Sequence, residues 1–131
     1  MKKNELINEW LRRAKSNLER SRLGNNKIAD ILYEDYCYDS QQCVEKSLKA
    51  LLIFYDIEFP RTHSINLLLN LLENKIENIP DDIANGVILN DYAVETRYPG
   101  FYEPVSEEEF KKSLELAEKI FEWTITIIQR N

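Results

Sequence analysis

Residues 36–52 read Tyr36-Cys37-Tyr38-Asp39-Ser40-Gln41-Gln42-Cys43-Val44-Glu45-Lys46-Ser47-Leu48-Lys49-Ala50-Leu51-Leu52, and this stretch decides the fold. Its apolar and small side chains recur every three or four residues, which predicts a helix over about residues 34–57. They form two neighbouring stripes: Cys37, Gln41, Val44, Leu48, Leu51 and Tyr55, and Tyr36, Ser40, Cys43, Ser47, Ala50 and Phe54. Two stripes imply burial around most of the circumference, so we expect this helix to lie at the centre of the protein.

The segments on either side of this helix have the same helical spacing. They predict helices over residues 4–23, 64–75 and 80–97, and a last one that opens on the capping box 106–109 and continues through Ile128. Pro99 and Gly100 are expected to end the fourth helix. Because no segment alternates like a strand, the sequence predicts an all-α protein, an up-and-down antiparallel bundle of about five helices, forming a single domain over residues 1–131.

Length and cysteine content indicate the setting in which the chain folds. At 131 residues it is long enough for one hydrophobic core. Cys37 and Cys43, six residues apart on a helix, lie about 9 Å apart along the axis, which is too far for a disulfide. No apolar run is long enough for a bilayer span, and the first residues do not resemble a secretion signal. We therefore expect a soluble cytoplasmic protein.

The residue inventory excludes several kinds of chemistry. A single histidine and two cysteines at this spacing do not form the usual zinc clusters, so we predict no bound metal. Gly24, Gly86 and Gly100 are isolated, so neither a P-loop nor a dinucleotide-binding motif is present and no cofactor is expected. Most acidic pairs stand at helix starts, where the helix dipole alone accounts for them.

Charge is unevenly distributed along the chain. The net charge is −6, but residues 1–27 carry eight basic and three acidic side chains, a balance of +5, so the remainder carries −11. Two interpretations stay open. The basic face of the first helix either complements acidic surface on its neighbours or on a second subunit, or it binds phosphate groups.

Three segments together resemble one family, the HEPN domain. The central helix resembles its Gln-Gln-x-x-Glu-Lys-x-Leu-Lys-Ala-Leu-Leu signature, and two further matches follow in family order: Pro60-Arg61-Thr62-His63-Ser64-Ile65, similar to its Thr-His turn, and Glu95-Thr96-Arg97-Tyr98-Pro99-Gly100, similar to its Arg-Tyr-Pro segment. The resemblance implies a HEPN-like bundle, similar to nucleotidyltransferase substrate-binding subunits. It also implies a homodimer, in prokaryotes commonly encoded beside a minimal nucleotidyltransferase as a two-component or toxin–antitoxin pair.

Catalysis is the point on which this chain departs from the family pattern. The resemblance implies a metal-independent ribonuclease only where a member carries Arg-x4-6-His at the end of the fourth helix. Arg97 matches the arginine, but the fifth position after it is Tyr102 and no histidine follows. RNA cleavage needs groups that exchange protons near neutral pH, for which histidine is suited and tyrosine, with a pKa near 10, is not. The sequence therefore leaves open whether the protein is an enzyme; a nuclease would use Arg97 with Tyr102 or His63.

The first hypothesis is a nucleotide- or RNA-binding partner subunit of a small nucleotidyltransferase, and the alternatives are the ribonuclease toxin and a non-catalytic homodimeric adaptor. The candidate ligand-binding residues are Arg97, Tyr98, Tyr92, Asp39, Gln42 and Lys46. Arg97 suits a phosphate, although an ion pair with Asp91, Glu95 or Asp39 would equally account for it. The two apolar stripes and the aromatic cluster around Tyr92 offer surface for a dimer. Gln41, polar on an apolar stripe, must be hydrogen-bonded if buried, and we expect it to tie the central helix to the fourth.

Overall fold

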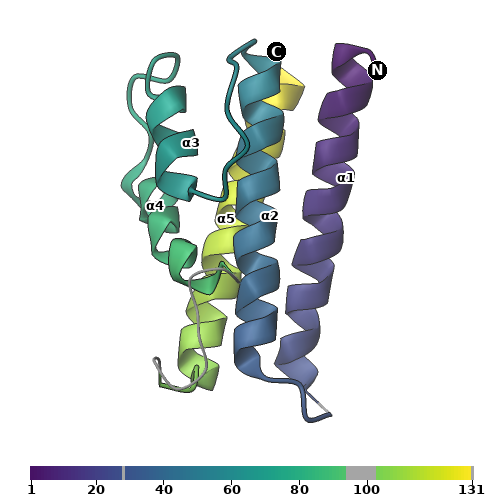
Figure 1. Ribbon diagram of the computed structural model, residues 1–131, viewed down its shortest axis with the longest axis vertical. Helices are drawn as coiled ribbons and strands as arrows, with labels where there is room; N and C mark the ends of the chain where they lie inside the picture. The colour runs from purple at the N-terminus through teal and green to yellow at the C-terminus, as the bar shows by residue number, and fades with distance from the viewer. Residues whose placement is uncertain (28, 94–102, 131) are drawn as a thin grey trace.

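The computed structural model describes residues 1–27, 29–93 and 103–130, and within these ranges every regular element is helical. In chain order the elements are α1 (Lys3–Arg22), η1 (Leu23–Asn26), α2 (Tyr33–Phe54), α3 (Ile65–Leu72), α4 (Asp81–Ala84), η2 (Asn85–Tyr92) and α5 (Glu107–Arg130). The three long helices lie side by side, with α1 antiparallel to α2, while α5 runs in the same direction as α2 (Figure 1). The prediction of an all-α protein with five helices is confirmed.

Helix α2 is the central element, as its double stripe predicts. It packs against α1, α3, η2 and α5, and Val44, Leu48, Leu51 and Leu52 are fully buried. The core that surrounds it comes from every other helix and includes Leu18, Ile65, Leu68, Leu72, Leu89, Phe110 and Ile120. Both stripes are thus covered within one chain, so they do not supply the free apolar surface that was expected to support a dimer.

Side-chain caps fix where the later helices begin. The Ser64 hydroxyl accepts a hydrogen bond from the Leu67 N–H at 3.1 Å, and the Asn90 side chain accepts one from the Ile65 N–H at 2.8 Å. At α5 the Ser106 hydroxyl accepts from the Glu109 N–H at 3.1 Å, which confirms half of the predicted capping box. The Glu109 carboxylate accepts a hydrogen bond from the Tyr92 hydroxyl.

The fourth helix is shorter and more irregular than the continuous helix predicted over residues 80–97. It consists of one α-helical turn, α4, followed by the 3₁₀ helix η2, which ends at Tyr92. Asn85, Gly86 and Asn90 are poor helix formers, and the Asn90 side chain is used to cap α3. A Cβ at Gly86 would come within 2.5 Å of Ile120 Cδ1, so the backbone here lies directly against α5. Ile88, an apolar residue within the predicted fourth helix, is 57% exposed.

The two cysteines lie inside this bundle. Cys37 and Cys43 are buried and form no disulfide, and burial raises the pKa of the Cys43 thiol to about 12. Within the described ranges, no helix combines the length and apolar character needed to cross a membrane.

Candidate functional site

The sequence-predicted site residues fall into three places. Arg97, Tyr98 and Tyr102 lie outside the described residues, and so does the end of the predicted fourth helix. Asp39, Gln42 and Lys46 follow one another along a single stripe of α2, and His63 comes from the loop that leads into α3. We call the stripe formed by Asp39, Gln42, Glu45, Lys46 and Lys49 the α2 polar face.

The Glu45 carboxylate contacts four neighbouring side chains. Its carboxylate accepts hydrogen bonds from Lys49 Nζ at 2.9 Å, Gln41 Nε2 at 3.0 Å and Gln42 Nε2 at 3.1 Å. His63 Nδ1 lies 3.1 Å from the same carboxylate. The Glu45 and Lys49 side chains are only 4% and 9% exposed, whereas the His63 side chain is 56% exposed. A buried ion pair therefore supports a histidine ring that is open to solvent.

The charge state of Glu45 determines the form of the histidine. Burial acts to raise the pKa of Glu45, but the hydrogen bonds from Lys49 and Gln41 and the charge of Lys49 outweigh it, so the pKa lies below its ordinary value. An ionised carboxylate only accepts hydrogen bonds, so His63 Nδ1 must carry the proton of their contact. In the neutral ring this leaves Nε2 as the acceptor nitrogen, which is the tautomer of a histidine oriented by a carboxylate.

Asn17 of α1 bridges Asp39 and Lys46 of the α2 polar face. Its side-chain amide donates to Asp39 Oδ1 at 2.9 Å and accepts from Lys46 Nζ at 2.7 Å. Arg20 Nε lies 3.5 Å from Asp39 Oδ2. Asp39, proposed as a partner for Arg97, is thus already bound by two side chains of α1.

Burial dominates the ionisation of Asp39 and Lys46. It raises the pKa of Asp39, and the hydrogen bond from Asn17 and the charges of Arg20 and Lys46 only partly offset it. It also lowers the pKa of Lys46, against the opposing charge of Glu45. Two desolvated groups of opposite sign are therefore bridged by one amide.

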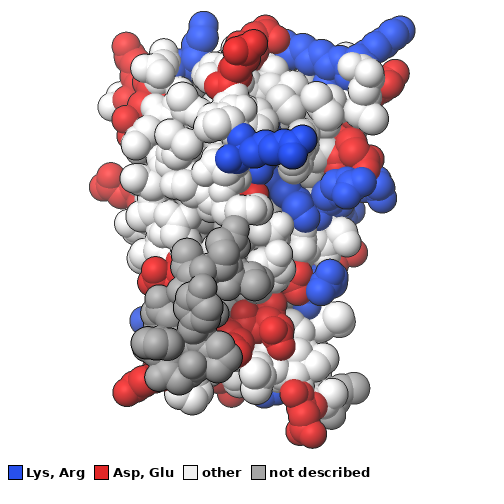
Figure 2. Space-filling view, viewed as in Figure 1, with Lys and Arg blue, Asp and Glu red and all other residues white. Residues whose placement is uncertain are grey.

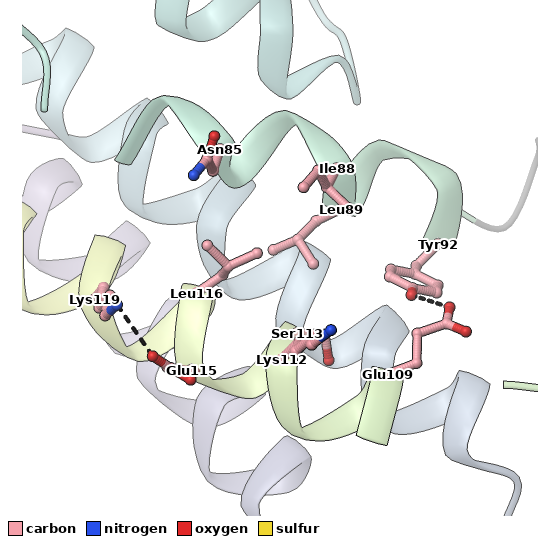
Figure 3. Close-up of a pocket in the computed structure, with 10 residues that line it drawn as sticks. All are labelled: Asn85, Ile88, Leu89, Tyr92, Glu109, Lys112, Ser113, Glu115, Leu116 and Lys119. Carbon is pink, nitrogen blue, oxygen red and sulfur yellow. Dashed lines mark hydrogen bonds and ion pairs between the residues drawn. The ribbon is translucent and has the colours of Figure 1, made fainter. Parts of the chain in front are cut away.

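Tyr92 is not brought to the α2 polar face. It lies in a separate pocket of about 300 Å³ between η2 and α5, whose lining also includes Ile88, Leu89 and Leu116. Figure 3 shows the Tyr92 hydroxyl pointing to the Glu109 carboxylate at one end of this pocket. The prediction that Tyr92 shares a ligand site with Asp39, Gln42 and Lys46 is not supported by this placement.

Ion pairs account for much of the basic character of α1. Lys and Arg gather on the side of the molecule formed by α1 (Figure 2). Arg12 and Arg13 bind Glu9 within the helix, at 2.7 and 2.9 Å, while three others reach across to neighbouring segments: Lys3 to Asp56, Arg20 to Asp39 and Arg22 to Glu118. Of the two interpretations of the basic N-terminal region, the structure therefore supports the first, because its basic side chains pair with acidic residues of the same chain.

Sequence reasoning missed three members of the site. Glu45, Lys49 and Asn17 were not selected as site residues, although Glu45 stands four residues after Gln41 and four before Lys49, the spacing at which helical side chains meet. Gln41 is buried and hydrogen-bonded as predicted, but its partners are Glu45, the Gln42 amide, from which its Oε1 accepts at 2.7 Å, and the His63 carbonyl, at 3.4 Å, and not the fourth helix. Among the described residues, no group of three or more His, Cys, Asp or Glu side chains is arranged to hold a metal ion.

Comparisons with known proteins agree with this architecture. The model of the HEPN domain matches residues 7–128. The archaeal HEPN homologue ST0689 has a crystal structure similar to this chain, with 31% identity, a TM-score of 0.73, and coverage of 93% of this chain and 97% of that one. The crystal structure of TT1696 from Thermus thermophilus is also similar, with 27% identity, a TM-score of 0.73, and coverage of 92% and 96%. No curated protein matches. The family match, together with the α2 signature and the Thr-His turn, shows that this chain belongs to the HEPN domain family.

Proposed function

We propose that this HEPN protein is a nucleotide- or RNA-binding subunit that works as the partner of a minimal nucleotidyltransferase in a two-component or toxin–antitoxin-like pair. The observation that carries the proposal is the α2 polar face. Asp39, Glu45 and Lys49 are 3–7% exposed, yet they stay polar on a helix that is otherwise surrounded by core. Clustered, desolvated ionisable groups are more typical of functional sites than of a solvated helix face.

Binding of RNA or a nucleotide is tested with the protein and a fluorescent single-stranded oligoribonucleotide. Lys46→Ala removes a partly desolvated ammonium from the face, and we expect it to weaken binding about tenfold or more, the effect of one lost hydrogen bond to a charged group. Lys119→Ala is the matched control because it removes the same charge from α5, where Lys119 pairs with Glu115 at 3.1 Å. Equal affinities for the two variants would refute a role for the α2 polar face.

The partner and the assembly need a separate experiment. We expect the protein to co-purify with a nucleotidyltransferase encoded beside it, and to behave as a homodimer when its mass is measured by light scattering. Failure of the two proteins to associate when produced together would refute the partner role, whatever the RNA measurement gives. A monomer that still bound the nucleotidyltransferase would refute only the homodimer.

A second candidate function is a metal-independent ribonuclease that uses His63 with Arg97. The specific observation in its favour is the Glu45–His63 contact, which gives an exposed imidazole the orientation and tautomer of a general base. RNA is incubated with the protein and a chelator, beside His63→Ala and Arg97→Ala. Loss of cleavage in both variants is expected for the nuclease, and cleavage that persists equally in both would refute it.

A further inference from the structure

A pocket next to the α2 polar face is formed by three segments that are distant in sequence. Trp10 of α1, Lys49 of α2 and residues 59–63 of the loop before α3 enclose about 370 Å³. This volume is within the range of small-molecule sites, roughly 300–1,000 Å³. It is larger than a phosphate group, so it has room for a second, bulkier part of a ligand.

The lining of the pocket includes both aromatic and cationic side chains. Phe59 is half-buried in the loop, and the Trp10 ring lies under Lys49 Nζ, 5.4 Å from the ring centroid. Flat aromatic walls of this kind stack with nucleobases, which all present a π-face. The aromatic residues therefore suit the base of a nucleotide.

The charges of the pocket favour an anion. Lys49 and Glu45 form a buried ion pair at 2.9 Å, so the negative charge of Glu45 is balanced and the pair adds no net charge to the pocket. Arg61 is exposed and makes no ion pair with another described residue. A guanidinium with this freedom binds phosphate oxygens in a forked arrangement, and the exposed ring of His63 stands in the same pocket.

We propose that this pocket binds a nucleoside phosphate, either free or as one unit of a single-stranded RNA, with the base against Trp10 and Phe59 and the phosphate on Arg61. The inference rests on the proposed nucleotide- or RNA-binding function and deepens it, because it names the unit that is bound and the side chains that bind it. Neither Trp10 nor Arg61 belongs to the α2 polar face, so the two sites can be tested separately.

Trp10 itself reports the binding. In a Trp123→Phe background it is the sole tryptophan, and its emission is followed while adenosine monophosphate or a short oligoadenylate is added. We expect quenching that saturates with at least one of the two ligands. Saturation with the mononucleotide alone indicates a free nucleotide, and saturation with the oligonucleotide alone indicates a unit of RNA. Inorganic phosphate is added as a competitor and is expected to displace the ligand only weakly.

Two further variants test whether the change in Trp10 emission comes from binding in this pocket. Arg61→Ala is expected to weaken binding about ten- to a hundredfold, the effect of losing a charge-assisted hydrogen bond. Lys111→Ala, which removes one positive charge from the start of α5, is expected to bind like the parent. If Trp123→Phe does not fold, the natural chain is titrated beside Trp10→Phe, which must lose the signal.

The outcomes separate this inference from the proposed function. If the intact protein binds RNA in the oligoribonucleotide experiment but Trp10 emission does not change, or changes equally in Arg61→Ala, the pocket is not the binding site and the inference is wrong. If Trp10 reports Arg61-dependent binding of a nucleotide while no nucleotidyltransferase associates, the inference stands and the partner role falls.

Discussion

Glu45 is the residue of the α2 polar face that binds Lys49, Gln42 and His63 together. Replacing it by glutamine leaves the Lys49 ammonium buried without a counter-charge, since that side chain is 9% exposed and pairs with Glu45 at 2.9 Å. We expect Glu45→Gln to lower the free energy of unfolding by about 3 kcal/mol, the lower end of the range for breaking a buried pair, because glutamine keeps one acceptor. Urea unfolding at pH 7 measures this loss.

Asp39→Asn is the matched control, and pH distinguishes the two carboxylates. Glu45 has a lowered pKa in the folded protein, so its contribution is present above the unfolded value of about 4.3 and is lost as the pH falls through the folded value. The stability difference between parent and Glu45→Gln should therefore shrink in acid. Asp39 has a raised pKa, so its charge is disfavoured by folding, and Asp39→Asn should cost at most about 1 kcal/mol. Equal losses at pH 7 would show that Glu45 has no special role.

The residue types alone predicted that the Gln41 amide is hydrogen-bonded if buried, but they did not predict which groups it binds. The rule that buried polar groups are hydrogen-bonded predicted the state of Gln41 correctly. The partner, however, depends on where the loop around His63 folds back against α2, which the periodicity of the sequence does not encode. Glu45 was overlooked for the related reason that a charged residue between two apolar stripes reads as solvent-exposed, whereas the loop covers it.

At the scale of elements, the junction of α1 and α2 depends on close packing at Gly24. A Cβ there would lie 2.6 Å from Phe110 Cζ and 2.8 Å from Tyr36 Cδ2, in a cluster where the Tyr33 and Phe110 rings stack at 5.4 Å. Neither ring can move without disturbing its neighbours. We expect Gly24→Ala to destabilise the protein by about 1–3 kcal/mol, as overpacking does, measured as a loss of thermal stability by circular dichroism.

Gly86→Ala provides the comparison for this effect. Its Cβ would meet the flexible tip of Ile120, at 2.5 Å, with Val44 only at 3.8 Å, whereas the Cβ at Gly24 would meet two aromatic rings. The net effect of Gly86→Ala should therefore be smaller than that of Gly24→Ala. A larger loss at Gly86 would mean that the η2–α5 contact, and not the α1–α2 junction, limits the packing of the bundle.

Helical periodicity located the long elements well and the short one poorly. α1, α2 and α5 each present a continuous apolar face to the core, so their spacing alone places them to within a few residues. The fourth helix was predicted as continuous because Ile83, Val87 and Ile88 share that spacing. In the fold, tertiary contacts decide otherwise: Gly86 lies against α5 and Asn90 is drawn to the start of α3, so the chain tightens into a 3₁₀ helix.

For the whole molecule, the basic N-terminal region looks like a nucleic-acid surface in sequence but carries few unpaired charges in the fold. Lys3, Arg12, Arg13, Arg20 and Arg22 all pair with carboxylates, and Lys27 Nζ lies 4.4 Å from the Tyr33 ring centroid. Among the described residues this leaves Lys2, Lys15 and Lys27, together with Arg61, as exposed cations without an ion pair on the α1 side of the molecule. The fold therefore offers a phosphate backbone far fewer contacts than the count of basic residues suggests.

The salt dependence of RNA binding measures this difference directly. Each phosphate contact on a single strand contributes about −0.7 to the slope of log K against log salt concentration, so four cations without an ion pair predict a slope of about −2.8, whereas all eight basic residues of the N-terminal region would give about −5.6. Anisotropy titrations of the oligoribonucleotide at several salt concentrations give the slope, and Arg61→Ala should reduce its magnitude by about 0.7. A slope near the larger value would mean that RNA opens the ion pairs to Glu9, Asp39 and Glu118 on binding. RNA binding would then compete with the ion pairs that α1 makes. Because salt screens these pairs too, the thermal stability of the protein should fall over the same range of salt concentration in which RNA binding weakens. With the smaller slope, the ion pairs remain intact and recognition is confined to the few side chains that the fold leaves exposed.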